Sequence, residues 1–370
     1  MHEKFMLHAL QLAAQYEGAT SPNPLVGAVI VKNGKVIVRG AHQKAGEPHA
    51  EINAITNAKE NLSNSTIYVN LEPCSHFGKT PPCVDAIIKS GISQVVIAMQ
   101  DPNPLVSGKG IQKLRKNNID VITGICEKEA KQLNEVFIKY ITTQKPFVVL
   151  KSAISLDGMI ATETNDAKWI SNEFSREKSH ALRNKCDAII IGKNTLLLDN
   201  PSLDVRIPNK YSDPQKIVII PKLDVSLKKI IEMKAYKLST EKPLIIVCNN
   251  NSNNTLKATK FINSGIEIIM LNKKENSLDL DELLIKLGKK EITSLLLEGG
   301  SGVYNSFLKQ NLVDKLYLFL ALLVIGKNGI HWAGNFNIKK LSSALRFEFD
   351  SVQQLDGNIQ IVCYPIRKEN

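Results

Sequence analysis

Patterns typical of strands and helices alternate along almost the whole chain, and this alternation most constrains the fold. Short apolar runs such as Thr66–Leu71 and Gln94–Met99 are each followed by a helical pattern, and the same order resumes at residues 147–153. Parallel strands need a long crossover, usually a helix, so the alternation predicts α/β sheets of parallel strands. Asn33-Gly34 between two apolar runs adds one hairpin.

The length of the chain predicts two domains. At about 150 residues per domain, 370 residues suffice for two. A long helical pattern at residues 127–142 ends just before Lys145-Pro146, where a new strand pattern begins. We therefore expect one domain at residues 1–145 and another at 146–370. Residues 195–206 are expected to be rich in loop, and the asparagine-rich residues 249–254 to form a surface loop.

One histidine, two cysteines and one glutamate occur in the order of a catalytic zinc site. His49-Ala50-Glu51 and Cys83 stand where helices are expected to begin, and Cys74 follows a predicted strand. An imidazole and two thiolates supply three ligands for one Zn²⁺ per chain, and the fourth position stays open for water. Glu51 is then the proton carrier in the signature of zinc-dependent nucleobase deaminases. A chance His-x-Glu and two unrelated buried thiols are the alternative.

Charge and composition leave several partner classes open and disfavour others. The net charge of +11 is spread along the chain, which fits dispersed surface lysines, phosphorylated small substrates or nucleic acid. No basic cluster of the kind that nucleic acid selects is present, so we expect no nucleic-acid partner. The longest apolar run, residues 316–325, is too short for a bilayer span, so no membrane attachment is expected. The start carries no signal-peptide core, and a cytoplasmic protein is expected.

The segment between the two cysteines narrows the chemistry. Eight residues separate Cys74 from Cys83 in Glu72-Pro-Cys-Ser-His-Phe-Gly-Lys-Thr-Pro-Pro-Cys83, whereas common cytidine deaminases use Cys-x-x-Cys. This block, with Ser21-Pro-Asn-Pro-Leu-Val-Gly27 and Asp101-Pro-Asn-Pro-Leu-Val-Ser-Gly108, resembles the bifunctional deaminase–reductase family of riboflavin biosynthesis. The resemblance implies a three-layer α/β/α domain of the cytidine-deaminase type at the N-terminus.

The resemblance also implies a substrate and its contacts. The substrate would be 2,5-diamino-6-(5-phosphoribosylamino)pyrimidin-4(3H)-one, a phosphorylated pyrimidine whose amine at C2 is hydrolysed to a carbonyl. Lys79 would meet the phosphate, and the polar side chains near the pyrimidine and ribose would be Asn23, His42, His76 and Asn103. Turn formation before proline is the alternative role for Asn23 and Asn103, and a solvated loop lysine is the alternative for Lys79.

The second half carries a glycine-rich turn but no dinucleotide-binding fingerprint of the Gly-x-Gly-x-x-Gly type. The apolar run Leu295–Leu297 leads through Glu298-Gly-Gly-Ser-Gly302 into a helical pattern. Such a turn can present backbone N–H groups to a phosphate, although a tight strand–helix connection is the alternative.

Three segments together resemble the reductase half of the same family: residues 151–158, residues 195–206 and this turn. The resemblance implies a dihydrofolate-reductase-like fold and NADPH-dependent reduction of the ribosyl group to ribityl, giving 5-amino-6-(5-phosphoribitylamino)uracil. The implied NADPH contacts are Ala153, Trp169, Thr195, Asp199, Gly300, Ser301, Gly302, Val303, Tyr304, Asn305 and Ser306, and the implied substrate contacts are Arg183, Leu203, Arg206 and Glu298. Asp199 is also a candidate for proton delivery. A core aromatic is the alternative for Trp169, and a surface carboxylate for Asp199.

Two positions depart from the family pattern. Ala167 stands where a serine often precedes the tryptophan, and Pro221 stands where Asp-Ser is common. Proline has no N–H, so one contact to NADPH would be lost there.

Two other functions compete with this hypothesis. An RNA-base deaminase would suit the positive charge, but aromatic residues make up only 6% of the chain, which is sparse for a base-stacking surface. A nucleotide-binding protein with a structural zinc would need a fourth protein ligand. The family resemblance further implies a homo-oligomer, a dimer or a tetramer.

Overall fold

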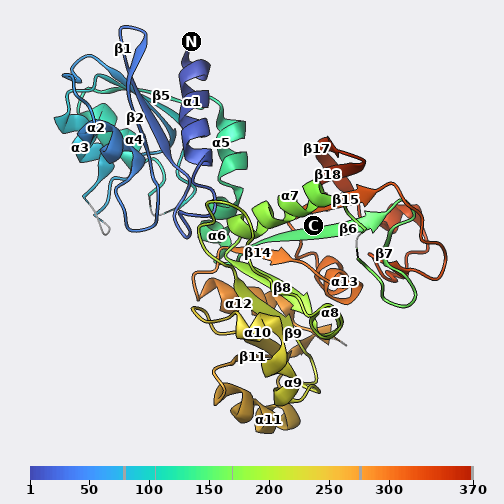
Figure 1. The fold of residues 1–370 in the computed structure, drawn as a ribbon. Helices are drawn as coiled ribbons and strands as arrows, with labels where there is room; N and C mark the ends of the chain where they lie inside the picture. The colour runs from blue at the N-terminus through green and yellow to red at the C-terminus, as the bar shows by residue number, and fades with distance from the viewer. Residues whose placement is uncertain (78–80, 105, 169, 275–276, 368–370) are drawn as a thin grey trace. The chain divides into compact units, whose positions relative to one another are not determined.

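The computed structural model describes residues 1–77, 81–104, 106–168, 170–274 and 277–367. The chain divides into two compact units, Met1–Gln144 and Lys145–Asn370, and each is described by itself (Figure 1). None of the helices formed by the described residues combines the length and the apolar character needed to span a bilayer.

The first unit is a five-stranded sheet with helices on its faces. Its strands are β1 (Gly27–Lys32), β2 (Lys35–Ala41), β3 (Thr66–Leu71), β4 (Gln94–Met99) and β5 (Asp120–Thr123). Its helices are α1 (His2–Ala14), α2 (Ala50–Thr56), α3 (Cys83–Lys89), α4 (Lys109–Lys116), α5 (Glu127–Leu133) and α6 (Glu135–Thr143). The strand order is β2-β1-β3-β4-β5. Strand β1 pairs antiparallel with β2 and β3, whereas β3, β4 and β5 run parallel.

Helices cover both faces of this sheet and make the predicted three layers. Helices α1 and α5 contact one another and the sheet, and on the other side α2 contacts the sheet and α3 (Figure 1). The backbone of α2 approaches β2 so closely that a Cβ at Gly40 would lie 2.3 Å from the carbonyl oxygen of Ala50. Glycine at this position therefore lets the helix that begins next to His49 lie directly on the strand.

The prediction of a single helix at residues 127–142 is wrong, because two helices, α5 and α6, meet at Asn134. The buried Asn134 side chain accepts a hydrogen bond from the Leu25 N–H at 2.8 Å and donates one to the Leu25 carbonyl at 3.0 Å. An asparagine side chain that is hydrogen-bonded to a distant backbone segment also constrains its own backbone. The backbone of Asn134 is not helical and has a φ of −103°.

The second unit is built on a nine-stranded sheet. The strands of the unit are β6 (Phe147–Ser155), β7 (Met159–Ala161), β8 (Ala188–Gly192), β9 (Gln215–Ile219), β10 (Ile245–Asn249), β11 (Glu267–Leu271), β12 (Lys273–Lys274), β13 (Ser277–Leu278), β14 (Ser294–Leu297), β15 (Lys315–Ala321), β16 (Ile330–His331), β17 (Phe347–Leu355) and β18 (Asn358–Pro365). Its helices are α7 (Glu173–Lys185), α8 (Lys193–Asp199), α9 (Leu227–Glu232), α10 (Lys234–Lys237), α11 (Ser252–Ile262), α12 (Leu280–Gly288), α13 (Ser301–Lys309) and the short 3₁₀ turn η1 (Leu341–Ser343).

The strand order of the large sheet is β11-β10-β9-β8-β14-β6-β15-β18-β17. Pairing is parallel from β11 to β15, as the alternation of strands and helices predicts. It turns antiparallel at β18 and β17, which the sequence analysis does not anticipate. The two smaller pairs are β12 with β13 and β16 with β7.

Two loop expectations in this unit hold only in part. Residues 200–206 form neither helix nor strand, but Lys193–Asp199 is the helix α8, so Thr195 and Asp199 stand on one helix. The asparagine-rich residues 249–254 are not a surface loop throughout, since Asn249 and Asn254 are buried. Asn251 caps α11 by accepting a hydrogen bond from the Asn254 N–H. Asparagine is a favoured N-cap residue, so the same composition that suits a loop also starts a helix.

Candidate active sites

In the first unit, the predicted metal ligands converge on one point. His49 is the N-cap of α2, Cys83 is the first residue of α3, and Cys74 follows β3. One donor atom from each of the three lies within 4.8 Å of the others. The His49 Nδ1 atom is 3.2 Å from the Cys83 sulfur and 3.7 Å from the Cys74 sulfur.

The chemistry of these donors fits zinc. Hydrogen bonds from the Cys83 thiol, the His49 ring and the Cys83 N–H lower the pKa of Cys74, and the hydrogen bond to Cys74 raises the pKa of His49. The hydrogen bond with Cys74 and burial raise the pKa of Cys83, so its thiol holds its proton more firmly than that of Cys74. A divalent cation would replace that proton, and two sulfurs with one nitrogen suit tetrahedral Zn²⁺.

Glu51 lies beside these donors in the first turn of α2, with only 3% of its surface exposed. Burial, with a smaller contribution from the charge of Cys74, raises the pKa of Glu51 to about 7. A carboxyl group with such a pKa can take up and release a proton near neutral pH.

Four of the five predicted contacts to the deaminase substrate are described. His42 is buried, and its Nε2 atom is 3.1 Å from the Asn23 amide nitrogen. His76 is exposed. The Asn103 N–H donates a hydrogen bond to the Asp101 carboxylate at 2.8 Å. Lys79 falls outside the described residues.

In the second unit, a cavity of about 860 Å³ opens at the carboxyl ends of β8 and β14, the end of a parallel sheet where ligands bind in open α/β folds. Among the predicted cofactor contacts, its lining includes Ala153, Thr195, Asp199, Gly300, Ser301, Gly302, Val303, Tyr304 and Ser306; among the predicted substrate contacts, it includes Arg183, Leu203 and Glu298.

Two described residues among the predicted contacts, Arg206 and Asn305, are not among these lining residues. Arg206 is largely exposed, 3.6 Å from the Asp204 carboxylate. Asn305 accepts a hydrogen bond from the Gly334 N–H at 2.5 Å. Trp169 lies outside the residues that the structure describes.

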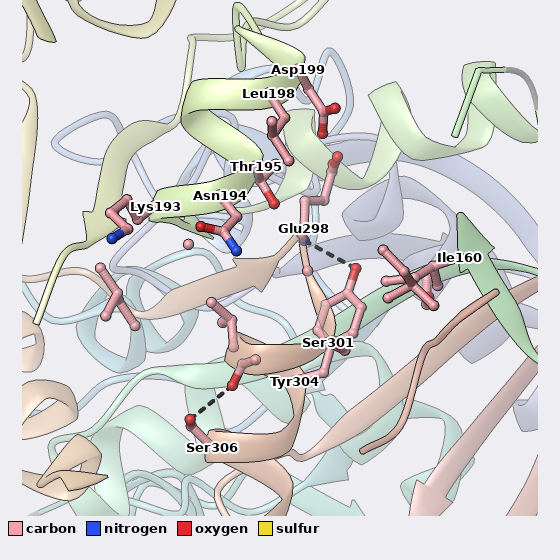
Figure 2. Close-up of a pocket in the computed structure, with 18 of the residues that line it drawn as sticks. Ile160, Lys193, Asn194, Thr195, Leu198, Asp199, Glu298, Ser301, Tyr304 and Ser306 are labelled. Atoms are coloured by element: carbon pink, nitrogen blue, oxygen red, sulfur yellow. Dashed lines mark hydrogen bonds between the residues drawn. The ribbon is translucent and has the colours of Figure 1, made fainter. Parts of the chain in front are cut away.

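The glycine-rich turn before α13 has the shape expected of a phosphate site. Gly300 is the N-cap at φ 60°, and no side chain caps the helix. The Tyr304 hydroxyl accepts from the Gly299 N–H at 3.0 Å and donates to the Lys151 carbonyl at 2.8 Å, which ties the turn to β6. Figure 2 shows Thr195 and Asp199 on α8, on the opposite side of the cavity from Ser301 and Tyr304. The turn therefore leaves the first N–H groups of α13 available to an anion.

A buried ion pair borders this cavity. Arg183 donates to both carboxylate oxygens of Glu298, at 2.8 Å and 2.7 Å, and to the Asp204 carbonyl at 3.0 Å. Burial alone would raise the pKa of Glu298, but the charge and hydrogen bonds of Arg183 lower it to about 2. Glu298 is therefore an ionised acceptor at neutral pH.

Sequence reasoning missed Lys151, which lines the same cavity from β6. Burial lowers the pKa of Lys151, opposed by the charge of Glu298. The available signal was a single charge inside the otherwise uncharged strand Phe147–Ser155.

Comparison with known proteins agrees with the two sites. Residues 1–99 match the family described as the cytidine and deoxycytidylate deaminase zinc-binding region, and residues 146–361 match the RibD C-terminal domain. The riboflavin biosynthesis protein RibD of Aquifex aeolicus is 42% identical over 97% of both chains. The chain belongs to the RibD family. The Escherichia coli member of the RibD family is 34% identical over 96% of this chain and 97% of its own.

Solved structures of RibD proteins share the fold. Acinetobacter baumannii RibD superposes with a TM-score of 0.87 at 32% identity, covering 99% of both chains. The Thermotoga maritima protein, described as a diaminohydroxyphosphoribosylaminopyrimidine deaminase and 5-amino-6-(5-phosphoribosylamino)uracil reductase, gives 0.86 at 36% identity and the same coverage. The predicted family, fold class, deaminase–reductase activity and cofactors are thereby confirmed.

Proposed function

We propose that residues 1–145 carry out the deamination, with His49, Cys74 and Cys83 holding one Zn²⁺ and Glu51 carrying protons. As a member of the RibD family, the chain is a bifunctional deaminase and reductase of riboflavin biosynthesis. The observation that carries the assignment is the set of three donor atoms within 4.8 Å of one another, next to a buried carboxyl group whose pKa is raised to about 7.

The proposed reaction hydrolyses the amine at C2 of 2,5-diamino-6-(5-phosphoribosylamino)pyrimidin-4(3H)-one. Zinc, when bound, supplies the Lewis acidity that makes a water molecule nucleophilic at neutral pH. Glu51 accepts a proton from that water as a C–O bond forms at C2, and delivers it to the ring nitrogen. The proton of the new C2 hydroxyl then passes through Glu51 to the amine, the C–N bond breaks, and ammonia leaves as the C2 carbonyl forms.

Polar side chains around this site are proposed to hold the substrate. The pyrimidine would form hydrogen bonds with Asn23, His42 and Asn103, since carboxamide and imidazole groups can both donate and accept hydrogen bonds. His76 would contact the ring or the ribose, and Lys79 would meet the phosphate.

The second step is proposed to take place in residues 146–370. NADPH, when bound, supplies a hydride to ribose C1′ in its open imine form. The cofactor would be held by the turn at residues 300–306 together with Ala153, Trp169, Thr195 and Asp199. The C1′–N double bond becomes single, and the nitrogen takes up the proton that completes 5-amino-6-(5-phosphoribitylamino)uracil.

Asp199 is proposed as the source of that proton. Burial raises the pKa of Asp199, and the charge of Lys168 only partly offsets this, so its carboxyl group retains a proton more readily than the Glu298 carboxylate. The proposed substrate contacts in this unit are Glu298, Arg183, Leu203 and Arg206. The described contacts use three of the five N–H donors of Arg183, which leaves the others for a phosphate.

The test is one assay with purified protein, the diaminopyrimidine substrate and NADPH. Ammonia release and loss of NADPH absorbance should both be observed, and metal analysis should give about one zinc per chain. Glu51→Gln should retain zinc and lose ammonia release by about a hundredfold or more, because the proton carrier is gone. Deamination that survives this change would exclude Glu51 from the role.

We also propose that the protein is a cytoplasmic homo-oligomer, a dimer or a tetramer, whose partners are phosphorylated pyrimidines and neither nucleic acid nor membranes. None of the six cysteines forms a disulfide, which suits a reducing compartment. Strand β17 stands at the edge of its sheet and exposes Phe349 and Val352 by 69% and 52%. An exposed apolar edge favours pairing with another chain. Light scattering at several concentrations would give the molecular mass in solution.

A further inference from the structure

The residue just after β3 is a buried carboxylate that no proposed step of the reaction uses. Glu72 has 3% of its surface exposed and stands two positions before the zinc ligand Cys74. Its oxygens accept hydrogen bonds from four backbone N–H groups: those of Asp101 at 3.2 Å, Gly108 at 2.9 Å, Gly110 at 2.9 Å and Ile111 at 3.2 Å. A buried charge is retained only where such partners compensate it.

These four N–H groups belong to one loop and to the start of α4. Asp101 and Gly108 lie on either side of Asn103, so Glu72 holds both ends of the turn that carries Asn103. Inside the turn, the Asp101 carboxylate accepts from the Asn103 N–H at 2.8 Å, and the Asn103 carbonyl accepts from the N–H groups of Val106 and Ser107, both at 2.9 Å. The backbone of Asn103 is therefore fixed relative to Glu72.

We propose that Glu72 is a positioning residue for deamination, which sets Asn103 relative to the zinc ligand Cys74. The inference rests on the proposed contact between Asn103 and the pyrimidine. Because Glu72 and Cys74 are two residues apart on one segment, the same short piece of backbone places the metal ligand and, through four hydrogen bonds, the loop that meets the substrate.

Glu72→Gln is the direct test, since it preserves size but replaces one acceptor oxygen with an amide nitrogen that faces N–H donors. We expect the KM for the diaminopyrimidine in the ammonia assay to rise about tenfold. Zinc content should stay near one per chain, and NADPH oxidation with the deaminated substrate should be unchanged. Glu127→Gln is the matched control, because Glu127 is a largely exposed carboxylate paired with Lys131 in the same unit.

A double-mutant cycle separates this inference from the proposed function. In the Asn103→Ala background, Glu72→Gln should change the KM by less than about twofold, since the two residues act through one contact. Asn103→Ala with an unchanged KM would remove Asn103 from the proposed function. If Asn103→Ala raises the KM and the double variant shows the sum of the two single effects, the positioning role of Glu72 is overturned while the proposed function stands.

Other outcomes of Glu72→Gln also decide the matter. Loss of zinc, or a lower kcat at constant KM, would show that Glu72 serves only the metal site or the fold, and an unchanged KM would overturn the proposal directly. If Glu72→Gln does not yield folded protein, Glu72→Asp keeps the charge on a shorter side chain. A raised KM with zinc retained then supports the proposal, and an unchanged KM overturns it.

Discussion

Two carboxyl groups that line the reductase cavity, Asp199 and Glu298, differ in the charges that surround them. Burial raises the pKa of Asp199 despite the charge of Lys168, whereas Arg183 overcomes the burial of Glu298 and lowers its pKa to about 2. Environment thus assigns different chemistry to the same functional group, one carboxyl group inclined to hold a proton and one fixed as an ionised acceptor.

The Asp199→Asn variant tests the first of these assignments. The amide preserves shape but cannot donate an acidic proton, so kcat for NADPH oxidation should fall about a hundredfold. Ammonia release should remain at the wild-type rate, because the deaminase ligands belong to the other unit. Equal loss of both activities would argue against separate sites, and an unchanged reduction rate would exclude Asp199 as the proton source.

The Glu298→Gln variant tests the ion pair through the pH dependence of stability. Because the pKa of Glu298 is lowered from 4.5 to about 2 in the folded protein, its stabilising contribution is present above pH 4.5 and is lost as the pH falls toward 2. At neutral pH the variant leaves Arg183 buried without its partner and should lower the free energy of unfolding by about 3–5 kcal/mol.

The difference in unfolding free energy between wild type and Glu298→Gln should therefore narrow as the pH falls from 4.5 toward 2. Urea unfolding followed by tryptophan fluorescence suits this test, because Trp169 and Trp332, the two tryptophans of the chain, both belong to the second unit. Glu232→Gln, a change at an exposed carboxylate of the same unit, is the control. A difference that stays constant across this pH range would contradict the assignment.

At the scale of elements, buried asparagines fix the segment that carries Asn23. Asn70 accepts from the Gly27 N–H and donates to the Leu25 carbonyl, both at 2.8 Å. Asn134, between α5 and α6, binds the N–H and the carbonyl of Leu25. Asn134, at the break between α5 and α6, and Asn70, inside β3, thus hold the same loop in place.

Asn134→Ala should destabilise the first unit by about 2–4 kcal/mol, since it leaves the Leu25 N–H without its partner and weakens the bonding of its carbonyl. Thermal unfolding monitored by circular dichroism would measure the loss. Asn117→Ala removes an exposed asparagine that bonds only within its own helix turn and should change stability by less than about 0.5 kcal/mol. Equal effects of the two substitutions would contradict the role of Asn134.

Elements fixed by local pattern could be predicted from the sequence, and those fixed by distant partners could not. The apolar runs at β3, β4 and β14 coincide with the predicted runs, because the buried strands of an α/β sheet are mostly apolar. The hairpin of β17 and β18 was missed although Asp356-Gly357, both at positive φ, marks its turn. The solvent-facing strand β17 lacks the apolar run on which the prediction relied.

The candidate sites follow the same division. His49, Cys74 and Cys83 could be recognised because zinc requires a few residue types in a recognisable order. Glu72 and Asn70 could not, because their partners are backbone N–H and carbonyl groups, which carry no trace in the sequence. The family resemblance implies that Arg183 contacts the substrate, whereas its hydrogen bonds to Glu298 join two segments that are distant in the chain.

At the scale of the whole molecule, each unit has its own sheet and its own cluster of buried apolar residues. Two sheets with separate cores allow the two reactions to be disabled one at a time.

Removal of zinc with a chelator should therefore abolish ammonia release while NADPH oxidation with the deaminated substrate continues at the wild-type rate. Activity should return when one equivalent of Zn²⁺ is added, because the ligands need only lose their protons to bind it again. Parallel loss of NADPH oxidation would indicate that the metal supports the second unit as well.

The division at Gln144 and Lys145 has a practical consequence for anyone who wishes to use this polypeptide. Among the described residues, no strand pairing joins the two sheets, so a cut at this point would leave every ladder of hydrogen bonds intact. Expression of Met1–Gln144 and Lys145–Asn370 as separate polypeptides would then show whether each catalyses its step alone.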